Sequence, residues 1–397
     1  MAHEPHEVVQ RVHEMSDRLQ AASEDSERLG RLSDDSVKAV RDAGVMRMLQ
    51  PTEYGGYAAH PRDFAEAVMA TASYCGATGW VCGVGGVHPW EMALMDRRLQ
   101  DEIWAEDSNT WIASPYAVTG IAEPVEGGYV LTGRWQFSSG TDHCDWVVLG
   151  ALVGDGTGKP ADPITSLHVV LPRKDYQIVE DSWDVVGLKG TGSKDIIVAG
   201  AFIPSYRTIN ADEVAQGDVA AARAGRGETV YRLPFWAMLP LGITSAVIGI
   251  SEGALRACLD YQRDRVSPLG LLIKDDPYIM YEISEAAADI EASRMQLITG
   301  ISDMHDAVES GATVSFADRA KIRRNQTRCA WRAVTAVDQL YARCGGNSVR
   351  NQFPLQRFWR DAHVGLNHAI HVPGQIYHAA TLTSLGIEPQ GSLRLII

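Results

Sequence analysis

The hydrophobic pattern of the sequence changes twice, and this restricts the fold more than any other feature. Up to about residue 107 the patterns are amphipathic or rich in Ala and Gly, as in packed helices. Between about 110 and 209, short apolar runs such as YVLTGRWQFSS are separated by Gly, Pro and Asp, which predicts an antiparallel β domain. Beyond Pro234, three long amphipathic stretches predict helices of an up-and-down bundle. We therefore expect an α+β chain with helices, then a barrel, then helices.

Composition and charge exclude several classes of protein. Of the 397 residues, 45% are hydrophobic and 22% charged, and the formal net charge is −14. This acidic balance argues against a nucleic-acid partner. The charged N-terminal segment is unlike a signal peptide, and no apolar run approaches the roughly 20 residues of a membrane span. The six cysteines form no CxxC pair and are expected to be buried thiols, so we predict a cytoplasmic protein.

The stretch GLKGTGSKDIIVAGAFIP, residues 187–204, superficially resembles a phosphate-binding loop. Gly187 and Gly192 have the spacing of a Walker A loop, but a Ser precedes Lys194 where that motif needs Lys first. A β-branched run follows instead of a helix. This run predicts a strand, a small turn at 199–200 and a second short strand. The glycines are therefore expected to shape a tight loop rather than a triphosphate site.

This order of elements, with that stretch at its centre, resembles the acyl-CoA dehydrogenase fold over nearly the whole chain. The segment QFPLQRFWRDAH and the glycine turn at 344–346 resemble further parts of that family. The resemblance implies an N-terminal helical domain over 1–107, an antiparallel β-barrel domain over 108–215 and a C-terminal four-helix bundle over 216–397. GRWQFSSGTDHCDWVVLGA and RFWRDAHVGLNH are similar to one branch, the oxygenase components of two-component flavin monooxygenases. Within it the chain most resembles the hydroxylases of secosteroid phenols, and more distantly p-hydroxyphenylacetate 3-hydroxylase and the dibenzothiophene monooxygenases.

Two departures separate the chain from the dehydrogenases of this fold. Those enzymes commonly carry a catalytic Glu where this chain has Ala369, and a methyl group cannot accept a proton. Their FAD-binding motifs contain a Phe and a Gln, which Leu269 and Ala342 replace here, while Arg265 of the first motif remains. An Arg that can hold a phosphate, without its neighbours that support adenine, favours FMN over FAD.

The resemblance implies an FMNH2-dependent oxygenase that hydroxylates a phenolic or other aromatic ring, steroid-derived or polycyclic, through a flavin C4a-hydroperoxide. The chain has no GxGxxG fingerprint, so a separate NAD(P)H:flavin reductase must supply the reduced flavin. A homotetramer is expected from the family. The alternatives are an FAD-dependent acyl-CoA dehydrogenase, an S- or N-oxygenating monooxygenase of the same fold, and a flavin-binding protein without activity.

The family motifs assign roles to residues on the predicted barrel and before it. Ser139 matches the hydroxyl beside flavin N5, and Phe137, expected on the same strand face, would pack on the flavin ring. Ser114 is placed at the flavin and in the substrate pocket. His88 is placed beside it, where an imidazole can accept a phenol's proton.

The remaining candidates lie in the C-terminal half. His368 is expected to stabilise the hydroperoxide and hold its proton, and His371 to line the substrate pocket as a second member. If helical, this H-x-x-H pair would share a face, but without an acidic or Cys neighbour in sequence it predicts no metal. Arg265 is expected at the flavin phosphate and Arg232 near the pocket. The basic residues of 321–324, Arg323 among them, are interpreted as a solvated helix face.

Overall fold

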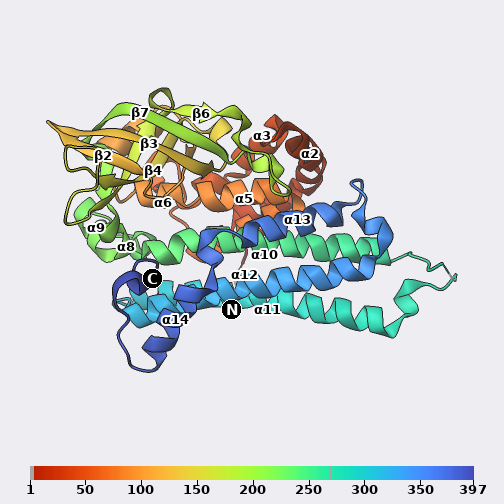
Figure 1. Cartoon of the computed structure of the whole chain (residues 1–397). Coiled ribbons are helices and arrows are strands. Elements are labelled where there is room, and N and C mark those ends of the chain that lie inside the picture. The colour runs from red at the N-terminus through yellow and green to blue at the C-terminus, as the bar shows by residue number, and fades with distance from the viewer. Residues whose placement is uncertain (1–3, 269) are drawn as a thin grey trace.

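The structure is a computed structural model of the chain and describes residues 4–268 and 270–397 (Figure 1). Its elements run in the expected order of helices, sheet and helices. The N-terminal helices are α1 Glu7–Glu14, α2 Ser16–Leu29, α3 Asp34–Ala43, α4 Pro61–Tyr74, α5 Gly76–Gly85, α6 His88–Met92 and α7 Arg97–Trp104. Local signals fix their ends: Ser33 caps α3 by accepting the N–H of Ser36, and Gly44 ends it with a φ of 88°.

One eight-stranded sheet follows, with strand order β6-β7-β3-β2-β4-β5-β8 and β1 beside β4. The strands are β1 Ile112–Ala113, β2 Gly120–Val125, β3 Gly128–Ser138, β4 Trp146–Val153, β5 Ser166–Pro172, β6 Gln177–Val179, β7 Lys194–Pro204 and β8 Thr208–Asn210. Most neighbours are antiparallel, but β1 and β2 both pair with β4 in parallel. The sheet is therefore mixed, and not wholly antiparallel as expected.

The predicted turn at 199–200 is wrong, because β7 continues through it. Thr132 of β3 pairs with Ala199 and Leu131 with Ala201, so Gly200 has no partner across the ladder. Gly200 has a φ of 84°, a conformation that glycine adopts without strain. The glycine therefore makes a β-bulge inside one long strand instead of a turn between two.

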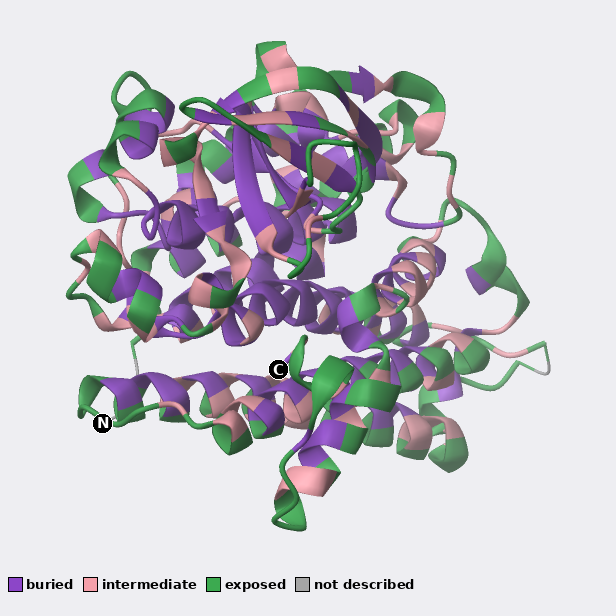
Figure 2. Cartoon of the chain, turned by 60° about the vertical axis from the view of Figure 1, so that its left-hand side comes forward, coloured by how far each residue is buried: buried purple, intermediate pink, exposed green. Residues whose placement is uncertain are grey.

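The C-terminal part is built around one very apolar helix. Its helices are α8 Ala211–Ala215, α9 Asp218–Ala224, α10 Phe235–Gln262, α11 Pro277–Glu309, α12 Phe316–Cys344, α13 Pro354–Leu366 and α14 Pro373–Ser384. Helix α10 packs on α4 and α5 on one side and on α11, α12 and α13 on the other. Contrary to expectation, it is long and apolar enough to cross a membrane, with a mean hydropathy of 1.4, but 89% of its apolar window is buried within the chain. It is therefore the core helix that joins both halves, and Figure 2 shows buried residues, in purple, concentrated where the sheet and the helices meet.

The interpretation of 321–324 as a solvated face is wrong for Arg323. Its side chain is fully buried and donates to the carbonyl groups of Ile370 and Ile396 and to Gln326. Burial lowers the pKa of Arg323 to about 9. The helical period of the sequence could not reveal this burial. The segments around Ile370 and Ile396 cover Arg323 only in the folded chain, and their backbone carbonyl groups accept its hydrogen bonds.

The six cysteines are all free and buried, as predicted. Cys258 and Cys344 are closest, with Sγ atoms 3.4 Å apart on α10 and at the end of α12. Free thiols throughout are usual in a reducing compartment.

Candidate active site

A chain of buried hydroxyl groups surrounds Ser139. Its Oγ lies 2.7 Å from the Oγ of Ser193, which in turn lies 2.7 Å from the hydroxyl of Thr191. The indole N–H of Trp80, on α5, donates to the Ser139 hydroxyl at 3.2 Å. The hydroxyl is therefore held on two sides, by a helix of the N-terminal part and by the glycine-rich segment before β7.

The glycines of that segment allow close approach to α13. A Cβ on Gly187 would lie 2.5 Å from the carbonyl oxygen of Arg360, and the N–H of Leu188 donates to Asp361 at 2.5 Å. Leu188 itself has a φ of 52°, the left-handed conformation. Burial raises the pKa of Asp361 to about 6. The glycine spacing therefore serves to dock this loop on α13, and the loop carries the hydroxyl groups that hold Ser139.

Contrary to expectation, Phe137 and Ser139 do not share one regular strand face, because the strand is irregular here. Its φ is 68° and the pairing of β3 with β7 is irregular between Trp135 and Ser138, so the alternation of side chains is broken here. The Phe137 ring is 64% exposed, while Ser139 is buried. A left-handed conformation at a bulky residue is unfavourable, and such strain is concentrated at functional sites.

A large cleft lies beside this aromatic side chain. The Phe137 ring meets the Trp183 ring edge-on, with centroids 6.2 Å apart. The segment after Trp183 forms one wall of a cleft of about 1020 Å³, whose other walls are α2 and residues 351–360. Val186, in the same wall, is 71% exposed. Apart from Val185 and Val186, the lining is polar, and most of it is charged: Glu24, Asp25, Glu27, Arg28, Asp184, Lys189, Arg357 and Arg360.

His88 begins α6 and is completely buried. Its Nδ1 lies 3.2 Å from the carbonyl oxygen of Gly85, so Nδ1 donates and Nε2 keeps its lone pair. Nε2 is buried and has no hydrogen-bond partner among the described residues. Burial lowers the pKa of His88 to about 4, so the ring is neutral and can accept a proton. Ser114, also buried, directly follows β1, which lies against α5 and α6.

A polar cluster beside His88 was not predicted from the sequence. Tyr116 stacks on the His88 ring, with centroids 5.8 Å apart and planes 18° apart. Its hydroxyl donates to Glu91, which also pairs with His168 Nδ1 at 2.5 Å. Glu91 follows His88 by three residues, which is the one sequence signal that could have revealed it. His168 lies on β5, and only the fold brings it here.

The two C-terminal histidines lie in different environments and not on one helix face. His368 precedes a short 3-10 turn, Ala369–His371, and its ring lies 5.9 Å from that of Trp80. It is therefore on the Ser139 side of the site. Desolvation and nearby Arg323 lower the pKa of His368 to about 4. His371 is fully buried, with Nε2 3.1 Å from the Thr244 hydroxyl and Nδ1 3.2 Å from the Gly365 carbonyl oxygen.

The two arginine candidates are not brought to Ser139 or His88 within one chain. Arg232 pairs with Asp218 at 3.0 Å and donates to the carbonyl oxygen of Val308. Arg265 follows the far end of α10, where it donates to Gln262 and to the Arg343 carbonyl oxygen. Thr244, which holds His371, is 18 residues from Gln262 on α10, or about 27 Å along the helix at about 1.5 Å per residue. Leu269, of the same motif as Arg265, lies outside the described residues.

The arrangement can accept a proton at His88, hydrogen-bond a ligand at Ser139 and stack a flat ring on Phe137. Trp80 connects Ser139 to His368, and Tyr116 connects His88 to Glu91. A flavin that reacts next to an aromatic substrate requires such a proton acceptor, such a hydrogen-bonding hydroxyl and such a stacking surface. The buried lone pair of His88 and the exposed strained Phe137 are the observations that fit a flavin and a phenol best.

Comparison with known proteins gives the same result. The family model described as "Acyl-CoA dehydrogenase, C-terminal domain" matches residues 241–373. The chain is 51% identical to "Pigment production hydroxylase" of Rhodococcus erythropolis, over 99% of this chain and 100% of that protein. It is 38% identical to "Flavin-dependent monooxygenase, oxygenase subunit HsaA" of Mycobacterium tuberculosis, over 89% of each chain. A crystal structure of the M. tuberculosis HsaA monooxygenase aligns over 98% of this chain and 99% of that one, with a TM-score of 0.90.

Two further relatives bear on substrate and cofactor. The oxygenase component of p-hydroxyphenylacetate 3-hydroxylase of Acinetobacter baumannii is 31% identical, over 84% of this chain and 78% of its own. XiaF of a Streptomyces species, solved with FADH2 and glycerol, is 25% identical, with a TM-score of 0.90 over 97% of this chain and 96% of its own. The resemblance that the motifs indicated is thereby confirmed.

Proposed function

Since the chain belongs to the oxygenase components of two-component flavin-dependent monooxygenases, which have the acyl-CoA dehydrogenase fold, we propose that it hydroxylates a phenolic ring with reduced FMN. The single observation that carries this proposal is His88, a neutral buried imidazole whose Nε2 has no partner among the described residues. A phenol O–H directed at that nitrogen would satisfy it. The motif resemblance to the hydroxylases of secosteroid phenols favours a steroid-derived or polycyclic phenol as the substrate.

The roles of the residues follow from their surroundings. When bound, reduced flavin supplies the activation of O2 that the side chains cannot provide. Ser139, fixed by Trp80 and Ser193, would hydrogen-bond the flavin at N5, and Phe137 would cover the ring. His368, on the other side of Trp80, would hold a proton near the reacting oxygen.

The substrate side has its own set of residues. His88 would accept the phenol proton, and Ser114 would hydrogen-bond the ring substituent where substrate and flavin meet. His371 would support this wall rather than touch the ring, because both its nitrogens already have partners. Arg232 would likewise close the pocket from outside through its pair with Asp218.

A direct test supplies chemically reduced FMN, oxygen and a panel of phenols to the purified protein. We expect hydroxylated, catechol-type products from at least one multi-ring phenol, measured by mass spectrometry. Oxygen consumed without any hydroxylated phenol, but with a sulfoxide or N-oxide from matched substrates, would move the activity to S- or N-oxygenation. Reduction of tightly bound FAD by an acyl-CoA would contradict the proposal altogether.

We further expect reduced FMN to bind more tightly than FAD. Arg265 is retained for a phosphate, while Ala342 replaces the Gln that supports adenosine in FAD-binding members. Anaerobic fluorescence titration with both reduced flavins measures the preference. Equal or tighter binding of FADH2, the flavin bound to XiaF, would show that the adenosine half has other partners here.

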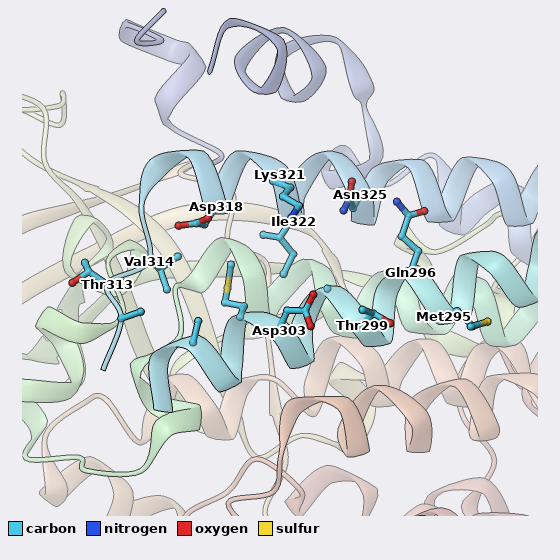
Figure 3. Close-up of a pocket in the computed structure, with 14 residues that line it drawn as sticks. Met295, Gln296, Thr299, Asp303, Thr313, Val314, Asp318, Lys321, Ile322 and Asn325 are labelled. Carbon is cyan, nitrogen blue, oxygen red and sulfur yellow. The ribbon is translucent and has the colours of Figure 1, made fainter. Parts of the chain in front are cut away.

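The position of Arg265 supports a homotetramer. It follows the end of α10 that is remote from Thr244 and His371, and its own-chain partners are Gln262 and the Arg343 carbonyl oxygen. We propose that it meets the flavin phosphate of a second copy of the chain. Apolar side chains on α11 are open, with Tyr278 81% and Met295 60% exposed. Figure 3 shows the groove of about 410 Å³ between α11 and α12, where Met295 and Ile322 are among the lining residues. We propose that other copies of the chain cover this face.

Light scattering at micromolar concentration tests the assembly, and we expect about four times the 43.3 kDa of one chain. Met295→Glu should weaken it, because a carboxylate placed in an apolar interface loses its hydration. Val125→Glu, at an exposed apolar position on β2, is the matched control. A monomer that binds flavin fully would contradict the proposed role of the partner's Arg265.

A further inference from the structure

The cluster around Glu91 has features that packing alone does not require. Glu91 is completely buried, yet it accepts the Tyr116 hydroxyl and pairs with His168 at 2.5 Å. These three side chains come from α6, the segment before β2, and β5. A buried carboxylate is costly unless it is hydrogen-bonded and paired, and this one is both.

Glu91 keeps its negative charge in this position. Burial on its own would raise the pKa of Glu91, but His168, Tyr116 and His88 together lower it below its ordinary value. Burial and the neighbouring carboxylate raise the pKa of Tyr116 well above its ordinary value, so Tyr116 remains a donor. The protein therefore maintains a fixed anion inside its core.

This anion lies close to the proton acceptor of the site. His88 and Glu91 are three residues apart on one short helix and so lie on the same face. The charge of Glu91 raises the pKa of His88 and partly opposes the effect of burial. Tyr116 stacks on the His88 ring while its hydroxyl is held by Glu91. The Glu91 carboxylate therefore holds Tyr116 against the imidazole of His88, and its negative charge also favours the protonated form of that imidazole.

We propose that Glu91 is a positioning residue for deprotonation of the substrate phenol: it holds Tyr116 against His88 and stabilises the His88 imidazolium. The inference rests on the proposed phenol hydroxylation. In this step the phenol O–H bond breaks and an N–H bond forms at Nε2. The electron pair stays on the phenolate oxygen and activates the ring carbon that receives oxygen. When the ring becomes aromatic again, the carbon that received oxygen loses its own proton, which balances the proton taken up by the second oxygen atom of O2 as that atom leaves as water. The proton on Nε2 returns to the phenolate oxygen, so His88 ends the cycle neutral.

A phenol that reports its own ionisation tests this without any flavin. We expect 4-nitrophenol bound to the flavin-free protein to absorb as the phenolate, and to absorb as the neutral phenol in Glu91→Gln. Glu66→Gln is the matched control, since Glu66 is mostly buried and paired with Arg294 away from this cluster. His88→Ala should abolish the phenolate signal both in the otherwise unmodified protein and in Glu66→Gln. An unchanged phenolate spectrum in Glu91→Gln would overturn the proposal.

The rate of hydroxylation gives a second readout that loss of packing would not reproduce. Across phenols of increasing pKa, Glu91→Gln should slow product formation by at least about tenfold, with the largest loss for the least acidic phenols. A uniform loss across the series would indicate a structural role and overturn the inference. If the unmodified protein hydroxylates no phenol, the proposed function fails instead, so the two failures are distinguishable.

Discussion

Replacing His88 by alanine should slow hydroxylation of the phenol by about 10²- to 10⁴-fold, the usual contribution of a positioned general base. The reason is that Nε2 of His88, whose ring stacks on Tyr116, is buried and has no hydrogen-bond partner among the described residues. Without it, the phenol proton has no acceptor in a site that excludes water. Single-turnover measurements with excess reduced FMN give the product rate directly.

The same variant should leave the flavin half of the site intact. Flavin reoxidation in the absence of substrate should proceed at the unmodified rate, since Ser139, Trp80 and His368 keep their contacts. His13→Ala, an exposed histidine that touches Tyr74, is the matched control and should retain full product yield. If His88→Ala forms product at the normal rate, His88 is a buried packing residue and the substrate assignment is wrong.

Ser139→Ala and His368→Ala should each separate oxygen consumption from hydroxylation. A lost hydrogen bond to a charged group costs about 1.5–3 kcal/mol, equivalent to about one to two powers of ten in rate. Oxygen should then be consumed at a near-normal rate, while hydrogen peroxide replaces most of the hydroxylated product. An oxygen electrode, a peroxide assay and product analysis on the same sample give the ratio.

A buried serine outside the site controls for the loss of a hydroxyl. Ser251 donates to the Val247 carbonyl oxygen within α10 at 2.9 Å, and Ser251→Ala should keep oxygen and product in their normal ratio. The two site variants are expected to fold, since alanine removes only one or a few hydrogen bonds at each position. Full product yield in both Ser139→Ala and His368→Ala would reduce these residues to packing roles.

The sequence predicted the parts of this protein that depend on local pattern. The hydrophobic period predicted the order of helices and strands, which is confirmed. The family motifs indicated Ser139, His88 and His368, whose roles stay predictions. The prediction failed where the backbone conformation of a single residue determines the local structure. Gly200 makes a bulge instead of a turn, and Phe137, with its φ of 68°, does not share one regular strand face with Ser139.

Long-range assembly set the other limit. Arg323 looks solvated by period, but the carbonyl oxygens of Ile370 and Ile396 reach it only in the fold. The Glu91 cluster joins residues 77 positions apart, from a helix and a strand. No sequence motif predicts this contact, because Glu91 and His168 are far apart in the chain and each is an ordinary residue for a helix or a strand.

The docking of the glycine-rich loop on α13 affects how variants of this protein should be interpreted. Any side chain at Gly187 would displace the Arg360 carbonyl oxygen, and one at Gly190 would meet Ser26 at 2.8 Å. Either shift would pass through Thr191 and Ser193 to Ser139. In a library selected for hydroxylation, these glycines would therefore be as intolerant as the residues of the reaction itself. A loss of activity at them would report a displaced hydroxyl and not a missing chemical group.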